Sequence, residues 1–283
     1  MWNLYDELYI GIPSGILVEG CVVGRLWITV RANGNIGVAR TLGDTDVDRN
    51  ALSQAVIGQP LREVANVLKW NSLVRASIGV AALNAFYNSA AHLERLNAPP
   101  AFQNELGGKK VAIIGELPNL ETGLKECSDL TVLPLPESGE LGAAYDAALT
   151  GDFVFISGDA LTNQTLPALL DKVGAETKVS LAGISVPAAP VLFAFDNPIH
   201  NLSGVYARFD ATVEGAAMRD TPDLAPGTAP FSVNPWKPRY LHDSPEVTRY
   251  QASPYKASVF NCAFNPWEGR DYDRSAWSPI FKG

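Results

Sequence analysis

Four short apolar runs in the middle of the chain constrain its fold more than any other feature. They lie at 109–115, 130–133, 153–157 and 178–182. Stretches with a helical pattern separate them, at 121–127, 141–149 and 166–173. A continuous apolar run is typical of a strand buried on both faces of a parallel sheet. The alternation predicts a Rossmann-like, doubly wound α/β sheet, whose loops gather at one edge where such folds bind ligands.

The segment before these runs has a different pattern. Strand-like runs at 16–23, 26–31 and 36–40 follow one another, and the Asn33-Gly34 step between the last two favours a tight hairpin. Helical periodicity then covers 61–68 and 72–96, with Asn71 placed to cap the longer helix. Strands followed by helices indicate an α+β unit.

Proline and aromatic residues mark the predicted domain limits. Pro99-Pro100 ends the first unit, which gives a domain over 1–98 and a second over 99–218. The extension 219–283 carries nine of the 20 prolines and three of the six tryptophans. We expect an irregular C-terminal tail laid over the body or over a partner subunit, because so much aromatic surface is costly to leave in water.

Composition excludes several classes of partner. The chain has 283 residues and a formal net charge of −8, which argues against binding nucleic acid. No apolar run is long enough for a membrane span, and three widely spaced cysteines indicate a reducing compartment. We therefore expect a cytoplasmic protein without membrane contact. The three histidines lack the spacing of a soft-metal site, although Glu116 and Glu137 could still meet a hard cation.

Two glutamates follow the first two predicted parallel strands. The turn Gly115-Glu116 lacks the G-x-G-x-x-G pattern, so no dinucleotide cofactor is expected. Glu116 is a candidate catalytic acid or base if the loop is partly buried, and otherwise a solvated loop carboxylate. Glu137 is the second candidate, because an acid at this place often holds a hydroxyl or amine of a ligand. The alternative for Glu137 is a plain turn residue.

Polar and small residues also follow the third and fourth strands. Ser157 and Asn163 bound a polar loop that enters a helix and could receive an anionic or carbonyl group, although Asn163 or Thr162 could simply cap that helix. After the fourth strand, Gly183 permits close approach of a ligand and Ser185 offers a hydroxyl. There is no G-x-S-x-G elbow here, so a serine-hydrolase triad is not expected.

Asn84 and Asn88 lie four residues apart within the long helix, amid small apolar residues. Asparagine is a poor residue for the middle of a helix, so another interaction must stabilise it there. One alternative is hydrogen bonding across a domain interface, and the other is a ligand bound in that interface.

The sequence resembles the DUF364 family, a heavy-metal chelation domain, preceded by its usual DUF4213 partner. The resemblance covers roughly 1–215 and rests on several motifs in order. They are Trp27-Ile28-Thr29-Val30, Gly37-Val38-Ala39-Arg40-Thr41, Trp70-Asn71-Ser72, the run 78–85, Ile113-Ile114-Gly115, the run 156–165, and Ala189-Pro190-Val191-Leu192-Phe193 with Leu202-Ser203-Gly204.

This resemblance implies an enolase N-terminal-like domain followed by a Rossmann-like domain, with a site in the cleft between them. It also implies condensation or hydrolysis of pterin-, flavin- or siderophore-like molecules. Two positions depart from the family pattern, since Glu116 stands in place of a histidine and Gly183-Ile184-Ser185 in place of Gly-Pro-Ser.

The leading hypothesis is an enzyme that acts on a small heteroaromatic or metallophore-like compound, with Glu116 and Glu137 as acid–base or ligand-holding groups. The strand loops would face the asparagine-bearing helix across an enclosed hollow. The residues expected to contact the compound are Asn84, Asn88, Gly115, Ser157, Asn163, Gly183 and Ser185. The alternatives are a non-catalytic protein that binds a metal–organic complex, and an assembly protein whose tail forms the interface of a homo-oligomer.

Overall fold

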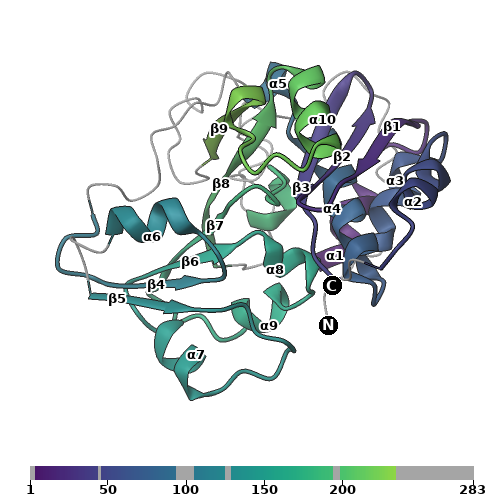
Figure 1. The fold of residues 1–283 in the computed structure, drawn as a ribbon. Coiled ribbons are helices and arrows are strands. Elements are labelled where there is room, and N and C mark those ends of the chain that lie inside the picture. The colour runs from purple at the N-terminus through teal and green to yellow at the C-terminus, as the bar shows by residue number, and fades with distance from the viewer. Residues whose placement is uncertain (1–3, 44–45, 94–104, 125–128, 194–197, 234–283) are drawn as a thin grey trace, which may run out of the picture.

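The computed structural model describes residues 4–43, 46–93, 105–124, 129–193 and 198–233 (Figure 1). We call 4–93 the N-terminal half and 105–233 the C-terminal half. The N-terminal half contains β1 (Val18–Val23), β2 (Trp27–Ala32), β3 (Asn35–Arg40), α1 (Leu4–Ile10), α2 (Arg49–Val56), α3 (Leu61–Asn66), η1 (Val67–Lys69), α4 (Leu73–Tyr87) and α5 (Ala90–Leu93).

The three strands of the N-terminal half form the expected antiparallel meander, in the order β1-β2-β3. Asn33 and Gly34 have φ angles of 51° and 71°, so both turn residues adopt the left-handed conformation that a tight hairpin requires. The capping prediction is wrong, because Ser72 rather than Asn71 occupies the N-cap of α4 and makes no side-chain bond there. α2 was not predicted; its N-cap is Asp48, which accepts a hydrogen bond from the Ala51 N–H.

The C-terminal half is built on a six-stranded sheet with the order β5-β4-β6-β7-β8-β9. Its strands are β4 (Lys110–Ile114), β5 (Asp129–Leu133), β6 (Phe153–Ser157), β7 (Lys178–Ala182), β8 (Ile199–Ala207) and β9 (Thr228–Val233). The first five are parallel and β9 is antiparallel. This confirms the doubly wound sheet. The connections run in opposite directions on either side of the β4–β6 pair, which is therefore the topological switch point.

Helices cover both faces of this sheet (Figure 1). The helices of the C-terminal half are α6 (Pro118–Leu124), α7 (Ala143–Ala148), α8 (Asp159–Thr162), α9 (Leu166–Leu170), η2 (Pro190–Phe193), α10 (Asp210–Met218) and η3 (Ala225–Gly227), of which α10 packs on the N-terminal meander instead. Val111 and Ile113 of β4 pack with Leu124 of α6 in a small separate cluster. Ala112 and Ile114 point to the opposite face and join the main core. Alternation along β4 thus buries both faces, as the apolar runs predicted.

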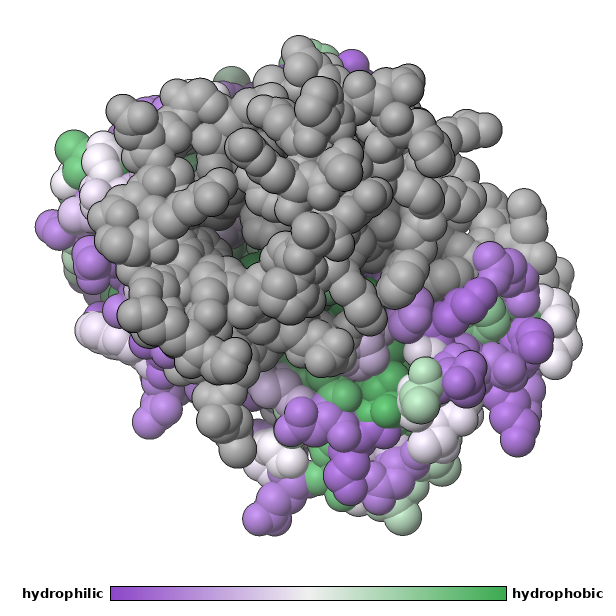
Figure 2. All heavy atoms as spheres, turned by 180° about the vertical axis from the view of Figure 1, so that it is seen from behind, coloured by the Kyte–Doolittle hydropathy of each residue, from purple (hydrophilic) through white to green (hydrophobic). Residues whose placement is uncertain are grey.

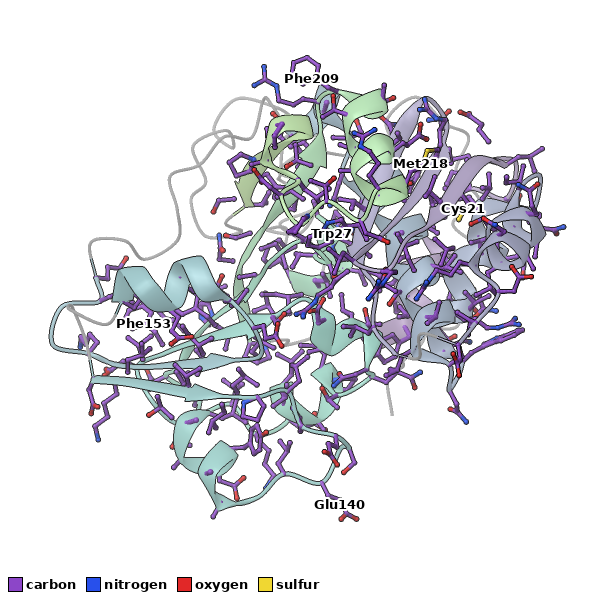
Figure 3. All side chains as sticks on the ribbon, in the orientation of Figure 1. Cys21, Trp27, Glu140, Phe153, Phe209 and Met218 are labelled. Carbon is purple, nitrogen blue, oxygen red and sulfur yellow. The ribbon has the colours of Figure 1, made fainter. Side chains whose placement is uncertain are left out.

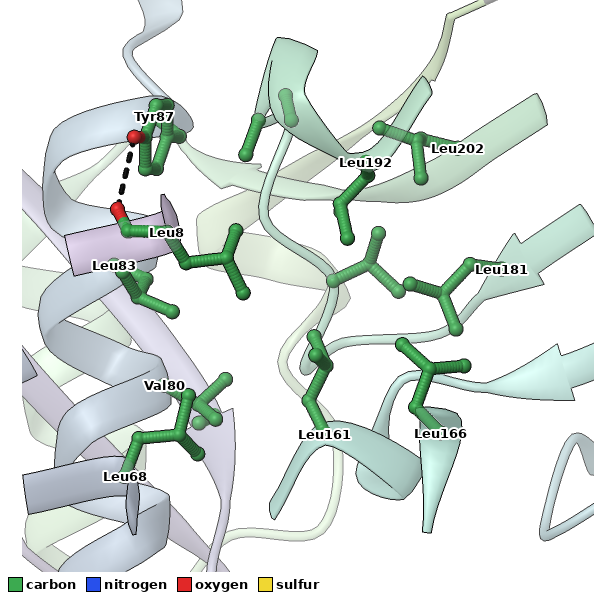
Figure 4. Packing of buried hydrophobic residues seen from close by; sticks show 14 of the residues in the cluster. Leu8, Leu68, Val80, Leu83, Tyr87, Leu161, Leu166, Leu181, Leu192 and Leu202 are labelled. Atoms are coloured by element: carbon green, nitrogen blue, oxygen red, sulfur yellow. Dashed lines mark hydrogen bonds between the residues drawn. The ribbon is translucent and has the colours of Figure 1, made fainter. Parts of the chain in front are cut away.

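One main core runs through both halves (Figure 4). Leu8, Val80 and Leu83 of the N-terminal half belong to the same cluster as Leu161 and Leu192 of the C-terminal half. The Tyr87 hydroxyl donates a 3.0 Å hydrogen bond to the Leu8 carbonyl beside this contact. The predicted enclosed hollow between α4 and the strand loops is therefore wrong at this place, because aliphatic side chains fill it.

The chain returns from the C-terminal half to the N-terminal sheet. Val213 and Ala216 of α10 pack on Ile36 and Val38 of β3, on the face of the meander opposite to α4. On the α4 side, Gly37 brings β3 against the helix so closely that an added Cβ would lie 2.0 Å from the Ala81 carbonyl oxygen. β3 is thus held between α4 and α10.

β9 lies in the predicted C-terminal extension and was not anticipated. Pro230 is tolerated there because β9 is an edge strand, where a missing N–H need not break a ladder bond. Residues 234–283, which carry most of the predicted tail, lie outside the described residues. Seen from behind, the described surface is mainly hydrophilic with a smaller hydrophobic area (Figure 2). Within the described ranges no helix is both long and apolar enough to cross a membrane.

Candidate functional site

Glycines shape the turns that leave β4, β6 and β7 at the carboxyl edge of the sheet. Gly115 and Gly183 have φ angles of 96° and 114°, which residues with a side chain rarely adopt. A Cβ on Gly115 would lie 2.6 Å from the Ser157 Cβ, and a Cβ on Gly158 would lie 2.6 Å from the Val186 Cγ2. The three turns are therefore packed closely together, which brings the residues that follow the glycines to one place.

Arg40, the last residue of β3, reaches across this edge from the N-terminal half. Its Nη1 lies 2.6 Å from the Glu116 Oε2 and 3.5 Å from the Asp159 Oδ2. Glu116 follows β4 and Asp159 follows β6, so the guanidinium spans the topological switch point. The Arg40 backbone N–H also donates to the Ser185 Oγ at 3.0 Å. We call Arg40, Glu116, Asp159 and Ser185 the Arg40 cluster.

Asp159 is the buried acid of the Arg40 cluster, with its side chain only 8 % exposed. The Ser185 hydroxyl donates a 2.7 Å hydrogen bond to its Oδ1, while Oδ2 faces Arg40. Burial raises the pKa of Asp159, and the Ser185 hydrogen bond and the Arg40 charge oppose that shift without cancelling it. The Asp159 carboxyl is thus held in one orientation, and burial makes it easier to protonate than an exposed aspartate.

The environment of Glu116 differs from the one that the sequence predicted. Its side chain is 72 % exposed, so the partial burial on which its predicted acid–base role depended is wrong. The residue stands in a turn beyond the end of β4, where few neighbouring atoms exclude water. Its contact with Arg40 is an ion pair at the protein surface, and such a pair is weak enough to be replaced by another anion.

The other predicted residues at this edge lie apart from the Arg40 guanidinium or bind the protein itself. Glu137 is exposed and stands near Tyr145, whose hydroxyl donates to the Pro134 carbonyl. Asn163 donates to the Pro136 carbonyl at 3.0 Å and accepts from the Thr165 hydroxyl. The alternative that Asn163 or Thr162 caps the following helix is wrong, because the N-cap of α9 is Thr165. Ser157 is buried beside Gly115 and accepts a 3.3 Å bond from the Asp159 N–H.

Asn84 and Asn88 connect the two halves. Asn84 Nδ2 donates to the Val38 carbonyl at 2.7 Å and to the Ile184 carbonyl at 3.3 Å. Asn88 Nδ2 donates to Val186 and Val205 carbonyls, and its Oδ1 accepts from the Ala188 N–H. These contacts correspond to the alternative of hydrogen bonding across the interface. Asn84 Oδ1 is buried without a hydrogen-bond partner, in a side chain close to the residue before Ser185.

Sequence reasoning missed Arg40 and Asp159 as site residues. Asp159 had a recognisable signal, since an acid directly after Ser157-Gly158 stands at the carboxyl end of a buried parallel strand. Arg40 belongs to a motif that carries the family resemblance, but nothing in that motif links it to the two acids, because it ends a hairpin strand in the other half of the molecule. Only the packing of β3 against the sheet edge brings it to the two acids.

The Arg40 cluster does not offer a direct metal site. Its two carboxylates already face one guanidinium, and no group of three histidine, cysteine, aspartate or glutamate side chains suited to a metal ion occurs among the described residues. A metal ion bound directly would need more oxygen ligands than the carboxylates of Glu116 and Asp159 supply. The donor set fits an organic anion, which a guanidinium binds through paired hydrogen bonds.

Comparisons with known families and proteins agree with this fold. The family model DUF4213 matches residues 5–87 and the family model DUF364 matches residues 99–218, and both are described as "Putative heavy-metal chelation". The uncharacterized protein MJ0500 of Methanocaldococcus jannaschii is 29 % identical over 182 residues, which cover 59 % of this chain and 69 % of that protein.

Two solved structures share the architecture. A DUF364 protein of unknown function from Desulfitobacterium hafniense is 30 % identical, with a TM-score of 0.72, over 82 % of this chain and 97 % of that one. A second protein of unknown function from the same family, PH1506 of Pyrococcus horikoshii, is 17 % identical with a TM-score of 0.59. It covers 82 % of this chain and 98 % of its own, and at that identity it supports the fold alone.

Proposed function

Because the chain belongs to the DUF364 family, whose model is described as a heavy-metal chelation domain, we propose that it binds a small organic anion that itself chelates a metal ion. The anion binds at the Arg40 cluster. This is a binding function for a metal–organic complex, and the metal is part of the cargo. The observation that carries the proposal is the position of Arg40 between an exposed and a buried carboxylate at the switch point.

Arg40 has the properties of an anion receptor. Its side chain is 37 % exposed, so a ligand has access to the guanidinium without displacing the core. Asp159 stays buried and fixed by Ser185, whereas the exposed Glu116 is the partner that an incoming carboxylate or phenolate can replace. Glu116 therefore competes with the ligand for Arg40 rather than binding it.

Asp159 and Ser185 position the receptor. The Oδ2 atom of Asp159 faces the guanidinium, and its Oδ1 atom accepts the hydrogen bond from the Ser185 hydroxyl. The Arg40 N–H bound to the same Ser185 oxygen ties the backbone of β3 to this turn. These contacts fix the arginine before any ligand arrives, which lowers the entropic cost of binding.

The test is equilibrium dialysis of the full chain against three probes, which are ferric citrate, citrate alone and zinc chloride. We expect ferric citrate to bind, and Arg40→Gln to weaken it by tenfold or more. Glu116→Gln should bind ferric citrate more tightly, because the competing carboxylate is gone. Arg31→Gln is the matched control, since Arg31 also pairs with two carboxylates but lies away from the switch point.

Two results would overturn this function. One is unchanged binding of ferric citrate by a folded Arg40→Gln protein. The other is tight binding of zinc chloride alone, with no preference for a complexed metal, because that would require direct protein ligands.

A second function is favoured by the raised pKa of Asp159. A buried carboxyl that contacts a serine hydroxyl and an arginine can accept or donate a proton during condensation or hydrolysis. In such an enzyme Asp159 would take the acid–base role that sequence analysis gave to Glu116 and Glu137. Incubation with a metabolite extract, followed by mass spectrometry, separates the two functions. A compound altered by the native protein but not by Asp159→Asn supports the enzyme, whereas compounds returned unchanged support the binding protein.

A further inference from the structure

We infer that binding of the organic anion at Arg40 is coupled to the uptake of one proton by Asp159, at its Oδ2 atom. This inference rests on the proposed function and concerns the regulation of the same site. The proton comes from the solvent and returns to it when the anion leaves. The protein therefore holds its ligand more tightly as the pH falls and releases it as the pH rises.

Two carboxylates share the guanidinium of Arg40. Both ion pairs use its Nη1 atom, which lies 2.6 Å from the Glu116 Oε2 and 3.5 Å from the Asp159 Oδ2. The contact with Asp159 is the longer one, so it neutralises that carboxylate less completely. Side chains of both halves extend into this region, where β3 approaches the carboxyl ends of the parallel strands (Figure 3). Two negative charges thus face one positive charge before a ligand arrives.

The two carboxylates respond differently to an incoming anion. Glu116 is largely exposed, so it can turn into solvent and keep its charge when the anion replaces it. Asp159 cannot follow, because it is buried and the Ser185 hydroxyl holds its Oδ1. An anion on Arg40 covers Asp159 further and draws the guanidinium charge away from it. Both changes favour the neutral form of a buried carboxyl.

The direction of two hydrogen bonds fixes the place of the proton. The backbone N–H of Arg40 can only donate, so the Ser185 Oγ accepts from it at 3.0 Å. The single hydrogen of the Ser185 hydroxyl is then directed to the Asp159 Oδ1, at 2.7 Å. Oδ1 remains an acceptor, so a proton taken up by the carboxyl is placed on Oδ2. That atom faces Arg40, where its new O–H can donate to an oxygen of the bound anion.

Other charged groups near Asp159 do not compete for this role. Arg40 and Glu116 are the charged groups that act on its carboxyl, and burial is the main cause of its raised pKa. The helix α4, which packs against α8, has two titratable side chains, and both are engaged elsewhere. Arg75 lies over an indole ring, and the Tyr87 hydroxyl donates to a carbonyl of α1. Asp159 is therefore the group of the Arg40 cluster whose proton affinity an anion changes most.

The experiment measures proton uptake by calorimetric titration of the full chain with ferric citrate, in PIPES and in Tris at the same pH. The two buffers differ in ionisation enthalpy, so the difference in heat gives the number of protons bound with the ligand. Because citrate also titrates, each result is compared with that of Asp159→Asn. The wild-type protein should take up about one proton more than this variant. The ratio of their affinities should rise by up to about tenfold for each unit by which the pH is lowered.

Glu7→Gln is the matched control for Asp159→Asn. Glu7 in α1 is also a buried carboxyl with a raised pKa, but it lies outside the Arg40 cluster. This variant should take up as many protons as the wild type when ferric citrate binds. A loss of proton uptake in Glu7→Gln would overturn the inference, because the proton would then belong to Glu7.

The remaining outcomes separate this inference from the function on which it rests. If a folded Arg40→Gln protein binds ferric citrate as before, the proposed function fails. If Arg40→Gln weakens binding but wild type and Asp159→Asn take up equal numbers of protons, only the coupling fails.

A measurement on the wild-type protein decides the matter even if Asp159→Asn does not fold. The chain is labelled with carbon-13 at its aspartate carboxyls and titrated with gallium citrate, a diamagnetic probe. One aspartate signal should move to the chemical shift of a protonated carboxyl as the probe binds. Binding without such a movement would overturn the coupling.

Discussion

Two arginines on the same face of the N-terminal sheet reach into the C-terminal half, and their surroundings differ. Arg31 of β2 pairs with Asp210 and Glu214, both on α10, at 3.2 and 2.9 Å. All three side chains are partly exposed. Arg40 of β3 instead pairs with two acids from different turns, one buried and one largely in solvent.

The two arginines differ in whether their carboxylate partners are equivalent, and this separates a structural ion pair from a site that can bind an anion. The partners of Arg31 stand on a single helix, and Glu214 binds the guanidinium with both oxygens, so the interaction fastens α10 to the sheet. The partners of Arg40 are unequal, since one is fixed by Ser185 and the other is free to be replaced. The same residue types therefore serve attachment in one place and recognition in the other.

The largest effect should come from moving β3 itself. Gly37→Ala would place a Cβ 2.0 Å from backbone atoms of α4, and such overpacking should lower the free energy of unfolding by about 3 kcal/mol. A displacement of β3 also displaces Arg40, which is its last residue, so ferric citrate binding should be lost as well. Chemical denaturation measures the first effect and dialysis the second.

Gly20→Ala is the matched control for this change. Gly20 is also in a strand of the meander, but an added Cβ would lie 3.7 Å from the Arg31 Cβ, which is ordinary contact. We expect its stability to stay within about 1 kcal/mol of the wild type. Equal losses in the two variants would mean that close packing of β3 on α4 is not what holds Arg40 in place.

Arg40→Gln should have the next largest effect on stability. It leaves Asp159 buried without its cation, and removing one partner of a buried pair costs about 3–5 kcal/mol. Because Arg40 is 37 % exposed and Asp159 can take up a proton, we expect about 2 kcal/mol in urea denaturation at neutral pH. A loss no greater than that of Arg31→Gln would erase the distinction between the two arginines.

The pH dependence of stability should report the raised pKa of Asp159 in the folded state. Since its pKa is raised in the folded state, the folded protein binds more protons than the unfolded chain above the ordinary aspartate value, and the free energy of unfolding falls as pH rises through that range. Burial, helped by Asp6, also raises the pKa of Glu7 to about 7, with the same sign. The measurement therefore needs a Glu7→Gln background.

In that background, adding Asp159→Asn should flatten the remaining fall in stability with rising pH. Adding Asp210→Asn, which alters the Arg31 pair, should leave it in place. Thermal unfolding between pH 4 and pH 8 distinguishes these variants. A slope that survives Asp159→Asn would show that another group carries it.

The smallest effect should come from Arg31→Gln. Its pairs are partly exposed, and such pairs contribute about 1 kcal/mol or less, with screening by salt. We expect a small loss of stability that shrinks further in high salt, and no change in ferric citrate binding. Denaturation at low and high ionic strength, beside the dialysis assay, checks both parts.

The sequence predicted the parallel strands β4 to β7 because each contains a short apolar run. Burial on both faces explains the runs of β4, β6 and β7. β5 is an edge strand whose residues are exposed or half-buried, so the expectation that it is buried on both faces is wrong. β8 escaped prediction because polar residues interrupt it. Asn201 of β8 is buried, and it is hydrogen-bonded to Ser180 of β7 and Ser232 of β9, partners on neighbouring strands that no local pattern reveals. Such strands are recognised only once their partners are known.

The same limit applies to the candidate site. Gly115, Gly183 and Ser185 were predicted at the sheet edge because strand ends can be located from the sequence. The burial of Asp159 and the exposure of Glu116 depend on which turns pack together, and this is set by contacts between distant segments. Arg40 approaches from the other half, so its own motif does not indicate that it meets Glu116 and Asp159.

The return of α10 to the meander has a consequence for how the chain can be divided. A fragment that stopped before the parallel sheet would present Ile36, Val38 and Trp27 to water, because α10 normally shields them. We therefore expect neither the DUF4213 nor the DUF364 segment to persist alone, and the two would be inherited and lost together as one cooperative piece.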